Sequence, residues 1–244
     1  MPDAIVLCGG LGLRLRSVTA GAPKPMACIG GRPFLGLLLG QLERHGWERV
    51  ILAAGYKGEV IRDHFGERAF GLEVVHSCEP EPLGTGGALQ NALPLVKSDP
   101  VLVMNGDSYT EVDLRNCIAR HSASGAEVSI VVSPQDGRED SGAVAMDTNG
   151  SILGFAEKQR IDGMCYASSG IYVMSRAMLQ EIPAGRVSLE QELFPKWIGE
   201  GRKLSGIVCQ NRCVDIGTPE RYWSAQDLLA NRWERKIGSQ QAEL

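Results

Sequence analysis

Short runs of β-branched and apolar residues alternate with amphipathic segments through the first two-thirds of this 244-residue chain. Such alternation is typical of βαβ units, in which helices join parallel strands and cover the sheet. It predicts an α/β protein with a mostly parallel central sheet. The expected strands here are residues 4–8, 49–53, 72–76, 100–104 and 128–132, and the expected helices are 33–45, 58–65, 86–95 and 114–124.

The pattern changes after Gly142. Two apolar stretches, 142–146 and 151–156, flank the turn sequence Thr148-Asn149-Gly150, which indicates a β-hairpin and a sheet that becomes mixed. Beyond it we expect strands at 167–174, 204–209 and 213–215, and helices at 189–198 and 219–233. Because no break in composition interrupts the chain, residues 1–234 are expected to form a single domain, with 235–244 as a frayed, polar tail.

Composition and charge exclude several classes of partner. The chain has 25 basic and 29 acidic residues, so it lacks the basic surplus that would hold nucleic acid. Its longest apolar runs are far below the ~20 residues that span a bilayer, so no membrane segment is expected. The first residues do not resemble a secretory signal, which favours a cytoplasmic location.

The seven cysteines are scattered through apolar segments and are expected to be small buried side chains. Cys209 and Cys213 form a close pair, but no second Cys or His pair accompanies them to complete a zinc site.

A glycine-rich loop, Gly9-Gly10-Leu11-Gly12, follows the first expected strand directly. Backbone N–H groups in such a loop can approach phosphate oxygens closely, because no Cβ atom intervenes. Two familiar phosphate loops do not fit. A dinucleotide fingerprint needs Gly or Ala at Leu15 and an acidic residue about twenty positions further on, and a Walker loop needs Gly-Lys before Ser or Thr.

Two cations accompany this loop. Arg14 lies within it, and Lys24 lies between Pro23 and Pro25. An arginine can bind phosphate oxygens in a bidentate manner, and a lysine supplies a point charge where charge develops during phosphoryl transfer. The pair therefore suits a triphosphate. The alternative is that both are ordinary surface charges.

Six segments in a fixed order give the strongest indication. They are GGLGLRLRSVTAGAPKPMACIGGRPFLGLLLGQL (9–42), PLGTGGAL (82–89), NGDS (105–108), FAEK (155–158), SSGIYV (168–173) and DIGTPERY (215–222). Together they resemble the sugar-1-phosphate nucleotidyltransferases, also called nucleotide-diphosphosugar pyrophosphorylases. The resemblance implies a three-layer, Rossmann-like nucleotidyltransferase (GT-A-like) fold. It also implies transfer of a nucleoside monophosphate to a sugar 1-phosphate, with release of pyrophosphate.

The resemblance assigns roles to particular residues. The implied catalytic residues are Arg14, Lys24 and Asp107. The implied nucleotide-binding residues are Leu7, Gly9, Gly10, Gly12, Arg14, Lys24, Glu79, Pro82, Gly84, Thr85, Gly106 and Asp107. The implied sugar-phosphate residues are Asn105, Gly142, Glu157, Lys158, Ser169 and Gly170. Asp107 and Asp215 are the implied ligands of Mg²⁺, the expected cofactor.

Each of these roles has a simpler alternative. Asp107 and Asp215 both follow expected strands, where α/β sheets place ligands, and their carboxylates suit a hard cation. Asp107 could equally be a turn residue, and Asp215 a helix cap. Glu157 and Lys158 could be a solvated hairpin rim.

Two departures from the family pattern affect the expected contacts. Ser168-Ser169 stands where relatives commonly have Asn-Ala, which alters the fine contacts to the sugar. Leu13 replaces the usual Thr or Ser, which removes one hydroxyl contact to phosphate.

The segment 79–87 resembles the base-reading loop of the family. A carboxylate at Glu79 could accept hydrogen bonds from guanine N1–H and N2–H₂ together, so we expect GTP to be preferred. The alternative is two exposed glutamates, Glu79 and Glu81, on a proline-stiffened loop. Within the family, the motifs are most similar to those of bacterial D-glycero-D-manno-heptose 1-phosphate guanylyltransferases, followed by mannose 1-phosphate guanylyltransferases.

Two functions of other classes stay open. A non-catalytic nucleotide-sugar-binding regulatory subunit would share the fold, and a dinucleotide-dependent oxidoreductase is weakened by the failed fingerprint. The identity of the sugar and the oligomeric state are also open. A homodimer could use the apolar positions Trp223, Leu228, Leu229 and Trp233, although such residues more often pack onto a sheet.

Overall fold

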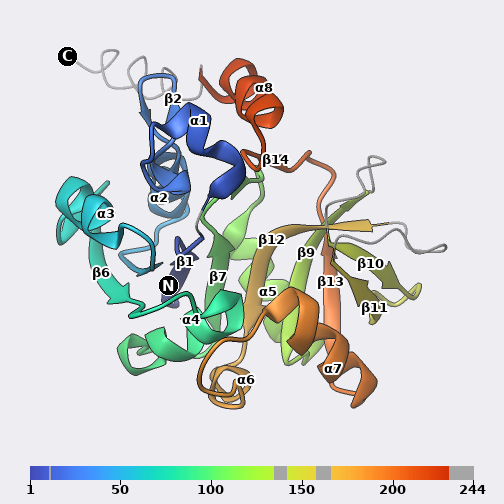
Figure 1. Cartoon of the computed structure of the whole chain (residues 1–244). Helices are drawn as coiled ribbons and strands as arrows, with labels where there is room; N and C mark the ends of the chain where they lie inside the picture. Colours follow the sequence, from blue (N-terminus) through green and yellow to red (C-terminus); the bar gives the residue numbers. More distant parts are fainter. Residues whose placement is uncertain (11, 135–141, 158–165, 231–244) are drawn as a thin grey trace, which may run out of the picture.

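The computed structural model describes residues 1–10, 12–134, 142–157 and 166–230. Ten of its strands form one sheet with the order β11-β10-β12-β7-β1-β4-β6-β5, in which β9 pairs with β12 and β13 pairs with β9 (Figure 1). In chain order these strands are β1 (Ala4–Leu7), β4 (Arg49–Ala54), β5 (Arg68–Ala69), β6 (Leu72–Cys78), β7 (Val101–Asn105), β9 (Val128–Pro134), β10 (Ala143–Met146), β11 (Ile152–Ala156), β12 (Tyr166–Met174) and β13 (Leu204–Val208).

The sheet is mixed, as predicted. Strands β7, β1, β4 and β6 are parallel neighbours, and β13 runs parallel to β9. Strand β12 is antiparallel to both β7 and β9, and so joins the two parallel groups. The predicted hairpin is confirmed as β10 and β11, whose turn is held by Asp147 Oδ1 accepting from the N–H groups of Asn149 and Ser151.

Helices cover both faces of the sheet, which gives the predicted three layers (Figure 1). On one face α2 (Phe34–Arg44), α3 (Gly58–Phe65), α5 (Leu114–Ser124) and α8 (Pro219–Leu229) share a buried core with Ala4 and Val6 of β1. On the other, α4 (Gly84–Ala92), α6 (Arg176–Gln180) and α7 (Phe194–Gly199) pack with Ile5. Alternate residues of β1 thus face opposite cores, as the pleat of a strand requires.

Several boundaries differ from the prediction for reasons of backbone chemistry. The helix expected at 189–198 begins instead as a π-helix, Leu189–Leu193, before α7. Pro195 has no N–H to donate to a preceding turn, so a regular ladder cannot run through it. Short elements of two to five residues, namely α1 (Arg16–Thr19), β2 (Cys28–Ile29), β3 (Arg32–Pro33), β5, β8 (Ser108–Tyr109) and α6, were not expected, because such lengths carry no periodicity.

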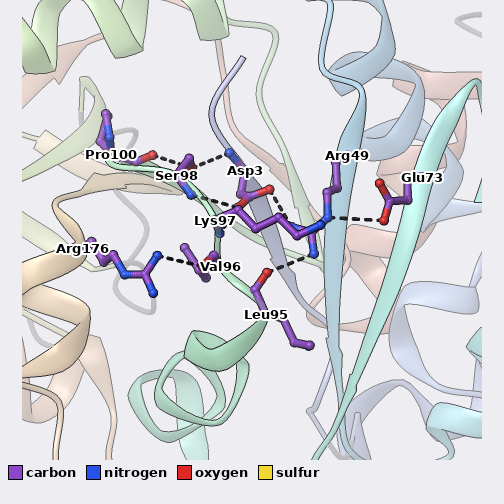
Figure 2. Close-up of polar contacts among 9 residues, drawn as sticks. All are labelled: Asp3, Arg49, Glu73, Leu95, Val96, Lys97, Ser98, Pro100 and Arg176. Atoms are coloured by element: carbon purple, nitrogen blue, oxygen red, sulfur yellow. Dashed lines mark hydrogen bonds and ion pairs between the residues drawn. The ribbon is translucent and has the colours of Figure 1, made fainter.

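A polar network fixes the amino-terminal ends of the parallel strands (Figure 2). Asp3 is buried and accepts hydrogen bonds from the N–H groups of Lys97 and Ser98 and from Arg49 Nη1. Arg49 also donates to Leu95 O and lies 3.5 Å from Glu73 Oε1. These contacts tie β1, β4 and β6 to the segment that enters β7.

Within the described part of the chain, none of the helices combines the length and apolar character that crossing a bilayer requires.

Candidate active site

The carboxyl ends of β1 and β7 lie side by side and begin the site. Leu7 pairs with Asn105 in the register of the two strands, and the Gly106 N–H donates to Leu7 O at 2.9 Å. A Cβ atom on Gly106 would lie 2.6 Å from that oxygen, so only glycine allows this approach. The glycine-rich loop and Asp107 therefore leave the sheet at one edge, where α/β proteins bind ligands.

The two predicted metal ligands are brought together by a pair of short strands. Strand β14 (Val214–Asp215) pairs with β8 so that Asp215 stands opposite Ser108, the residue after Asp107. The Ile216 N–H also donates to Asp107 O. Asp215 Oδ1 accepts from the Gly217 N–H, so the local turn orients this carboxylate as well.

Three cations surround these carboxylates. Lys24 Nζ lies 2.5 Å from Asp107 Oδ2, and Arg221 Nη1 lies 3.1 Å from Asp215 Oδ1. A Cβ atom built on Gly217 would lie 3.7 Å from Arg14 Nη2 and 3.5 Å from Arg221 Nη1, so the two guanidinium groups flank one backbone position. We call Arg14, Lys24, Asp107, Asp215 and Arg221 the charged cluster.

Arg221 was missed by the sequence analysis, although a signal was present. Thr218 caps α8 through the Arg221 N–H, and Pro219 occupies the first turn. This helix start places the Arg221 side chain in the first turn of α8, in contact with the Asp215 carboxylate.

The charged cluster lines one pocket together with most of the predicted sugar-phosphate residues. Glu157 Oε2 lies 3.1 Å from the position that a Cβ on Gly142 would take, which places this carboxylate over the backbone of the residue that precedes β10. The predicted residues that line this first pocket are Arg14, Lys24, Asn105, Asp107, Gly142, Glu157, Ser169, Gly170 and Asp215. Lys158 lies outside the described residues.

A second pocket adjoins the first and shares Asn105 and Asp107 with it. Its other predicted residues are Leu7, Gly9, Gly10, Glu79, Pro82, Gly84 and Thr85. Gly12 and Gly106 do not line either pocket; Gly12 packs against the Lys24 side chain, and Gly106 brings the two strand ends together. Unpredicted lining residues include Arg186 on an exposed loop, Tyr172 and Glu190.

Glu79 is half-buried over the glycine-rich loop, whereas Glu81 is exposed. The Leu83 N–H donates to Glu79 Oε2 at 3.1 Å, and a Cβ on Gly9 would overlap Oε1. Burial raises the pKa of Glu79 above its ordinary value, and the hydrogen bond from Leu83 opposes that rise. A side chain at position 9 would therefore displace this carboxylate from the position it takes here.

Three polar atoms in the two pockets are buried without a hydrogen-bond partner in the described part of the chain. They are Glu79 Oε1, Asn105 Oδ1 and Ser169 Oγ. Buried polar atoms are nearly always paired, so these three are available to hydrogen-bond with a ligand or with water. The Thr85 hydroxyl differs, because it already donates to Glu190 Oε2 and accepts from the Leu189 N–H. The single proton of this hydroxyl is therefore already used, and its oxygen can accept at most one further hydrogen bond from a ligand.

The two carboxylates suit a hard divalent cation. Their side chains are 40% exposed for Asp107 and 18% for Asp215, so both can exchange ligands with solvent. No group of three or more His, Cys, Asp and Glu side chains forms a metal cage among the residues described here. The pair of carboxylates is suited to Mg²⁺, which is usually held by one or two carboxylates plus substrate phosphates.

The model of the nucleotidyl transferase family matches residues 3–232 of the chain. The D-glycero-alpha-D-manno-heptose 1-phosphate guanylyltransferase of Aneurinibacillus thermoaerophilus is 36% identical over 229 residues, which cover 93% of this chain and 98% of that protein. The mannose-1-phosphate guanylyltransferase of Mycobacterium tuberculosis is 37% identical over 223 residues, or 90% of this chain, but this match spans only 62% of that longer protein.

A solved structure shows the same fold. The crystal structure of HddC from Yersinia pseudotuberculosis complexed with GMP-PN superposes with a TM-score of 0.81 and 33% sequence identity. The match covers 94% of this chain and all of that one.

Proposed function

Because this chain belongs to the nucleotidyl transferase family, we propose that it transfers GMP from GTP to a sugar 1-phosphate and releases pyrophosphate. The observation that carries this proposal is the charged cluster at the junction of the two pockets. The second pocket, lined by Gly9, Gly10 and Glu79, is suited to a nucleotide, and we call it the nucleotide pocket. The first pocket, lined by the charged cluster and Glu157, is suited to a sugar phosphate. The reacting phosphates would then meet at the charged cluster.

The reaction is an in-line transfer. A phosphate oxygen of the sugar 1-phosphate attacks the α-phosphorus of GTP, the bond from the α-phosphorus to the bridging oxygen breaks, and pyrophosphate leaves. No general base is needed, because the second proton of a phosphate monoester has a pKa of ~6 and is mostly lost at neutral pH. Catalysis is then positioning and charge stabilisation.

The residues of the chain divide this work. The backbone of Gly9 and Gly10 borders the nucleotide pocket, and Arg14 and Lys24 are placed to bind phosphate oxygens whose charge grows in the transition state. Asp107 and Asp215 would hold Mg²⁺, which when bound neutralises phosphate charge and aligns the triphosphate. Lys24 Nζ, which contacts Asp107 Oδ2, lies beside the carboxylate that would hold the metal, so it can bind a phosphate oxygen next to that metal.

The preference for guanine rests on Glu79. Its Oε1 is buried without a partner among the described residues, beside Gly9 in the nucleotide pocket. Guanine presents two donors, N1–H and N2–H₂, on one edge, whereas uracil and adenine do not. An ionised Glu79 therefore supports GTP as the nucleotide.

For the sugar we propose D-glycero-α-D-manno-heptose 1-phosphate, with mannose 1-phosphate as the second candidate. The heptose enzyme of Aneurinibacillus thermoaerophilus matches over nearly its whole length, which supports the first. A similar identity to the mannose enzyme of Mycobacterium tuberculosis supports the second. Within the first pocket, Ser169 Oγ and Asn105 Oδ1, which have no hydrogen-bond partner among the described residues, can bond to sugar hydroxyl groups.

The test is pyrophosphate release with Mg²⁺, in which GTP, ATP, UTP, CTP and dTTP are each combined with heptose, mannose and glucose 1-phosphates. Turnover confined to GTP and the heptose is expected. Turnover with GTP and mannose would move the proposal to the second sugar. No turnover from protein that still binds GTP would favour a regulatory subunit, although Arg14, Lys24, Asp107 and Asp215 are all present.

A further inference from the structure

Glu190 is a buried carboxylate that lies between the two pockets. It is 9% exposed and belongs to the π-helix Leu189–Leu193, which precedes α7. It lines the first pocket, and it also lines a groove that contains Gly84 and Thr85 of the nucleotide side. π-helical turns are rare and are frequent at functional sites, so its placement calls for an explanation.

Three hydroxyl groups donate to this carboxylate. Thr85 Oγ1 lies 2.5 Å and Ser188 Oγ 3.2 Å from Oε2, and Tyr172 Oη lies 3.1 Å from Oε1. The donors come from the first turn of α4, from strand β12 and from the loop before the π-helix. Glu190 therefore joins segments that lie 105 residues and 18 residues away along the chain.

Two of these three donors, Thr85 and Tyr172, line different pockets. Thr85 lines the nucleotide pocket, and Tyr172 lines the pocket of the charged cluster. Burial, together with the charge of Glu190, raises the pKa of Tyr172, so its hydroxyl stays protonated as a donor at neutral pH.

Backbone contacts reinforce the same junction. Val187 O accepts from the N–H groups of Gly86 and Gly87, and the Val187 N–H donates to Leu83 O. The start of α4 is thus held against the segment that carries Glu190.

A buried carboxylate close to anionic substrates is unfavourable unless hydrogen bonds satisfy it. Stability alone does not require a charge here, because an apolar side chain of similar volume can serve a core equally well. We propose that Glu190 is a positioning residue that holds the Thr85 and Tyr172 sides of the site in one arrangement. Binding of the nucleotide then favours binding of the sugar 1-phosphate, and the reverse.

The inference rests on the proposed function and is tested by binding rather than turnover. The dissociation constant of α,β-methylene-GTP, which cannot transfer its GMP group, is measured with Mg²⁺ by calorimetry, alone and with saturating heptose 1-phosphate. Binding couplings in proteins commonly span about 5-fold to 150-fold. We expect the wild-type protein to bind the analogue at least about fivefold more tightly with the sugar phosphate present.

In Glu190→Gln the coupling should fall below about twofold, because an amide cannot accept from all three hydroxyl groups through both of its heteroatoms. Glu200→Gln is the matched control. It makes the same change just after α7, where Glu200 is exposed and pairs with Lys196 at 3.8 Å, and it should keep the wild-type coupling.

If Glu190→Gln does not fold, a second pair of variants decides. Thr85→Ser keeps the hydroxyl donor and should keep the coupling, whereas Thr85→Val removes it and should lose the coupling. Absence of coupling in the wild-type protein, or equal coupling in wild type and in the Gln and Val variants, would overturn the inference. A lowered melting temperature with unchanged coupling would do the same. Failure of wild-type turnover in the pyrophosphate assay is a separate result, and it would count against the proposed function.

Discussion

Lys24 Nζ lies 2.5 Å from Asp107 Oδ2 across 83 residues of sequence. The sequence analysis expects Lys24 to bind the phosphates and Asp107 to bind the metal, and the structure pairs the two side chains with each other. The Lys24 side chain is 13% exposed and that of Asp107 is 40% exposed, so the lysine is held while the carboxylate faces solvent. The ion pair keeps Lys24 pointed at the place where a phosphate is expected.

Replacing Lys24 by Ala should lower kcat by about 10²-fold to 10³-fold, the usual loss when one preorganised donor to a developing oxyanion is removed. The fold should persist, because the Asp107 carboxylate, which loses its ion-pair partner in this variant, is accessible to water. Steady-state pyrophosphate release and a melting curve test both statements. Lys196→Ala, on the exposed face of α7, is the control and should keep full turnover. A kcat within threefold of wild type in Lys24→Ala would contradict the assigned role.

Asp215→Asn should raise the Mg²⁺ concentration needed for half-maximal turnover. The amide keeps the oxygen that can accept from the Gly217 N–H but removes the negative charge that a hard cation requires. Arg221, which lies 3.1 Å from Asp215 Oδ1, then loses its charged partner as well. The measurement is turnover against Mg²⁺ concentration at saturating GTP. An unchanged midpoint would remove Asp215 from the metal site.

Glu79→Gln should reduce the preference for GTP over ATP by about tenfold to a hundredfold, because a hydrogen bond to a charged group contributes about 1.5–3 kcal/mol. The comparison is kcat/KM for the two nucleotides with one sugar 1-phosphate. Glu81→Gln, at an exposed position on the same loop, is the matched control and should leave the ratio unchanged. A variant that keeps the full preference would show that guanine is recognised elsewhere.

The same carboxylate predicts a pH dependence. Burial raises the pKa of Glu79 above 4.5, so the group takes up a proton at a higher pH than an exposed glutamate would. Only the ionised form accepts both guanine donors, and the KM for GTP should therefore rise as the pH falls towards 5. The phosphates of the substrates also titrate in this range, but they do so equally in Glu79→Gln. The KM of wild type should thus rise more steeply than that of the variant, and parallel curves would refute the prediction.

Sequence periodicity was sufficient to predict most of the architecture, because it reports which face of each segment is buried. Helix 58–65 and helix 114–124 were located to the residue, and the hairpin after Gly142 was recognised from its turn. The glycine-rich loop, Asp107 and Asp215 were singled out by the family resemblance, together with their positions directly after expected strands.

Contacts between distant segments could not be predicted in the same way. The hydrogen bond from the Thr85 hydroxyl to Glu190 joins residues 105 positions apart, and nothing local in either segment predicts it. The partner of Lys24 could not be foreseen, because both Asp107 and a substrate phosphate satisfy a lysine.

Asp3→Ala should destabilise the fold while leaving KM and kcat unchanged. The substitution removes the partner of Arg49 Nη1 and of the N–H groups of Lys97 and Ser98 (Figure 2). These groups lie at the amino-terminal ends of the parallel strands, whereas the site lies at the carboxyl ends. Breaking a buried ion pair costs about 3–5 kcal/mol, so the loss should be of that order. Glu73→Ala is the control, because this glutamate is 52% exposed and its pairing with Arg49 should contribute less than about 1 kcal/mol. Urea unfolding measures the free energy of unfolding of both variants. Equal losses would mean that the burial of Asp3 does not determine how much its ion pair contributes.

His121 should make the stability of the fold depend on pH near neutrality. It is 6% exposed on α5, and its Nδ1 lies 2.9 Å from Ser129 Oγ, which in turn lies 2.9 Å from Ser205 Oγ. Burial lowers the pKa of His121 below 6.5, and the charge of Asp99 opposes part of that shift. The folded protein therefore prefers the neutral ring, whereas the unfolded chain takes up the proton at its ordinary pKa.

The sign of the effect follows from this difference. Above pH 6.5 the ring is neutral in both states and its contribution to stability is complete. As the pH falls below 6.5, the unfolded chain binds the proton first, so stability declines until the folded pKa is passed. The free energy of unfolding, measured in urea between pH 8 and 5, should fall less steeply in His121→Gln than in wild type. His64→Gln, at an exposed position of α3, should keep the wild-type slope. Equal slopes in wild type and His121→Gln would show that the buried chain of His121, Ser129 and Ser205 tolerates the charged ring.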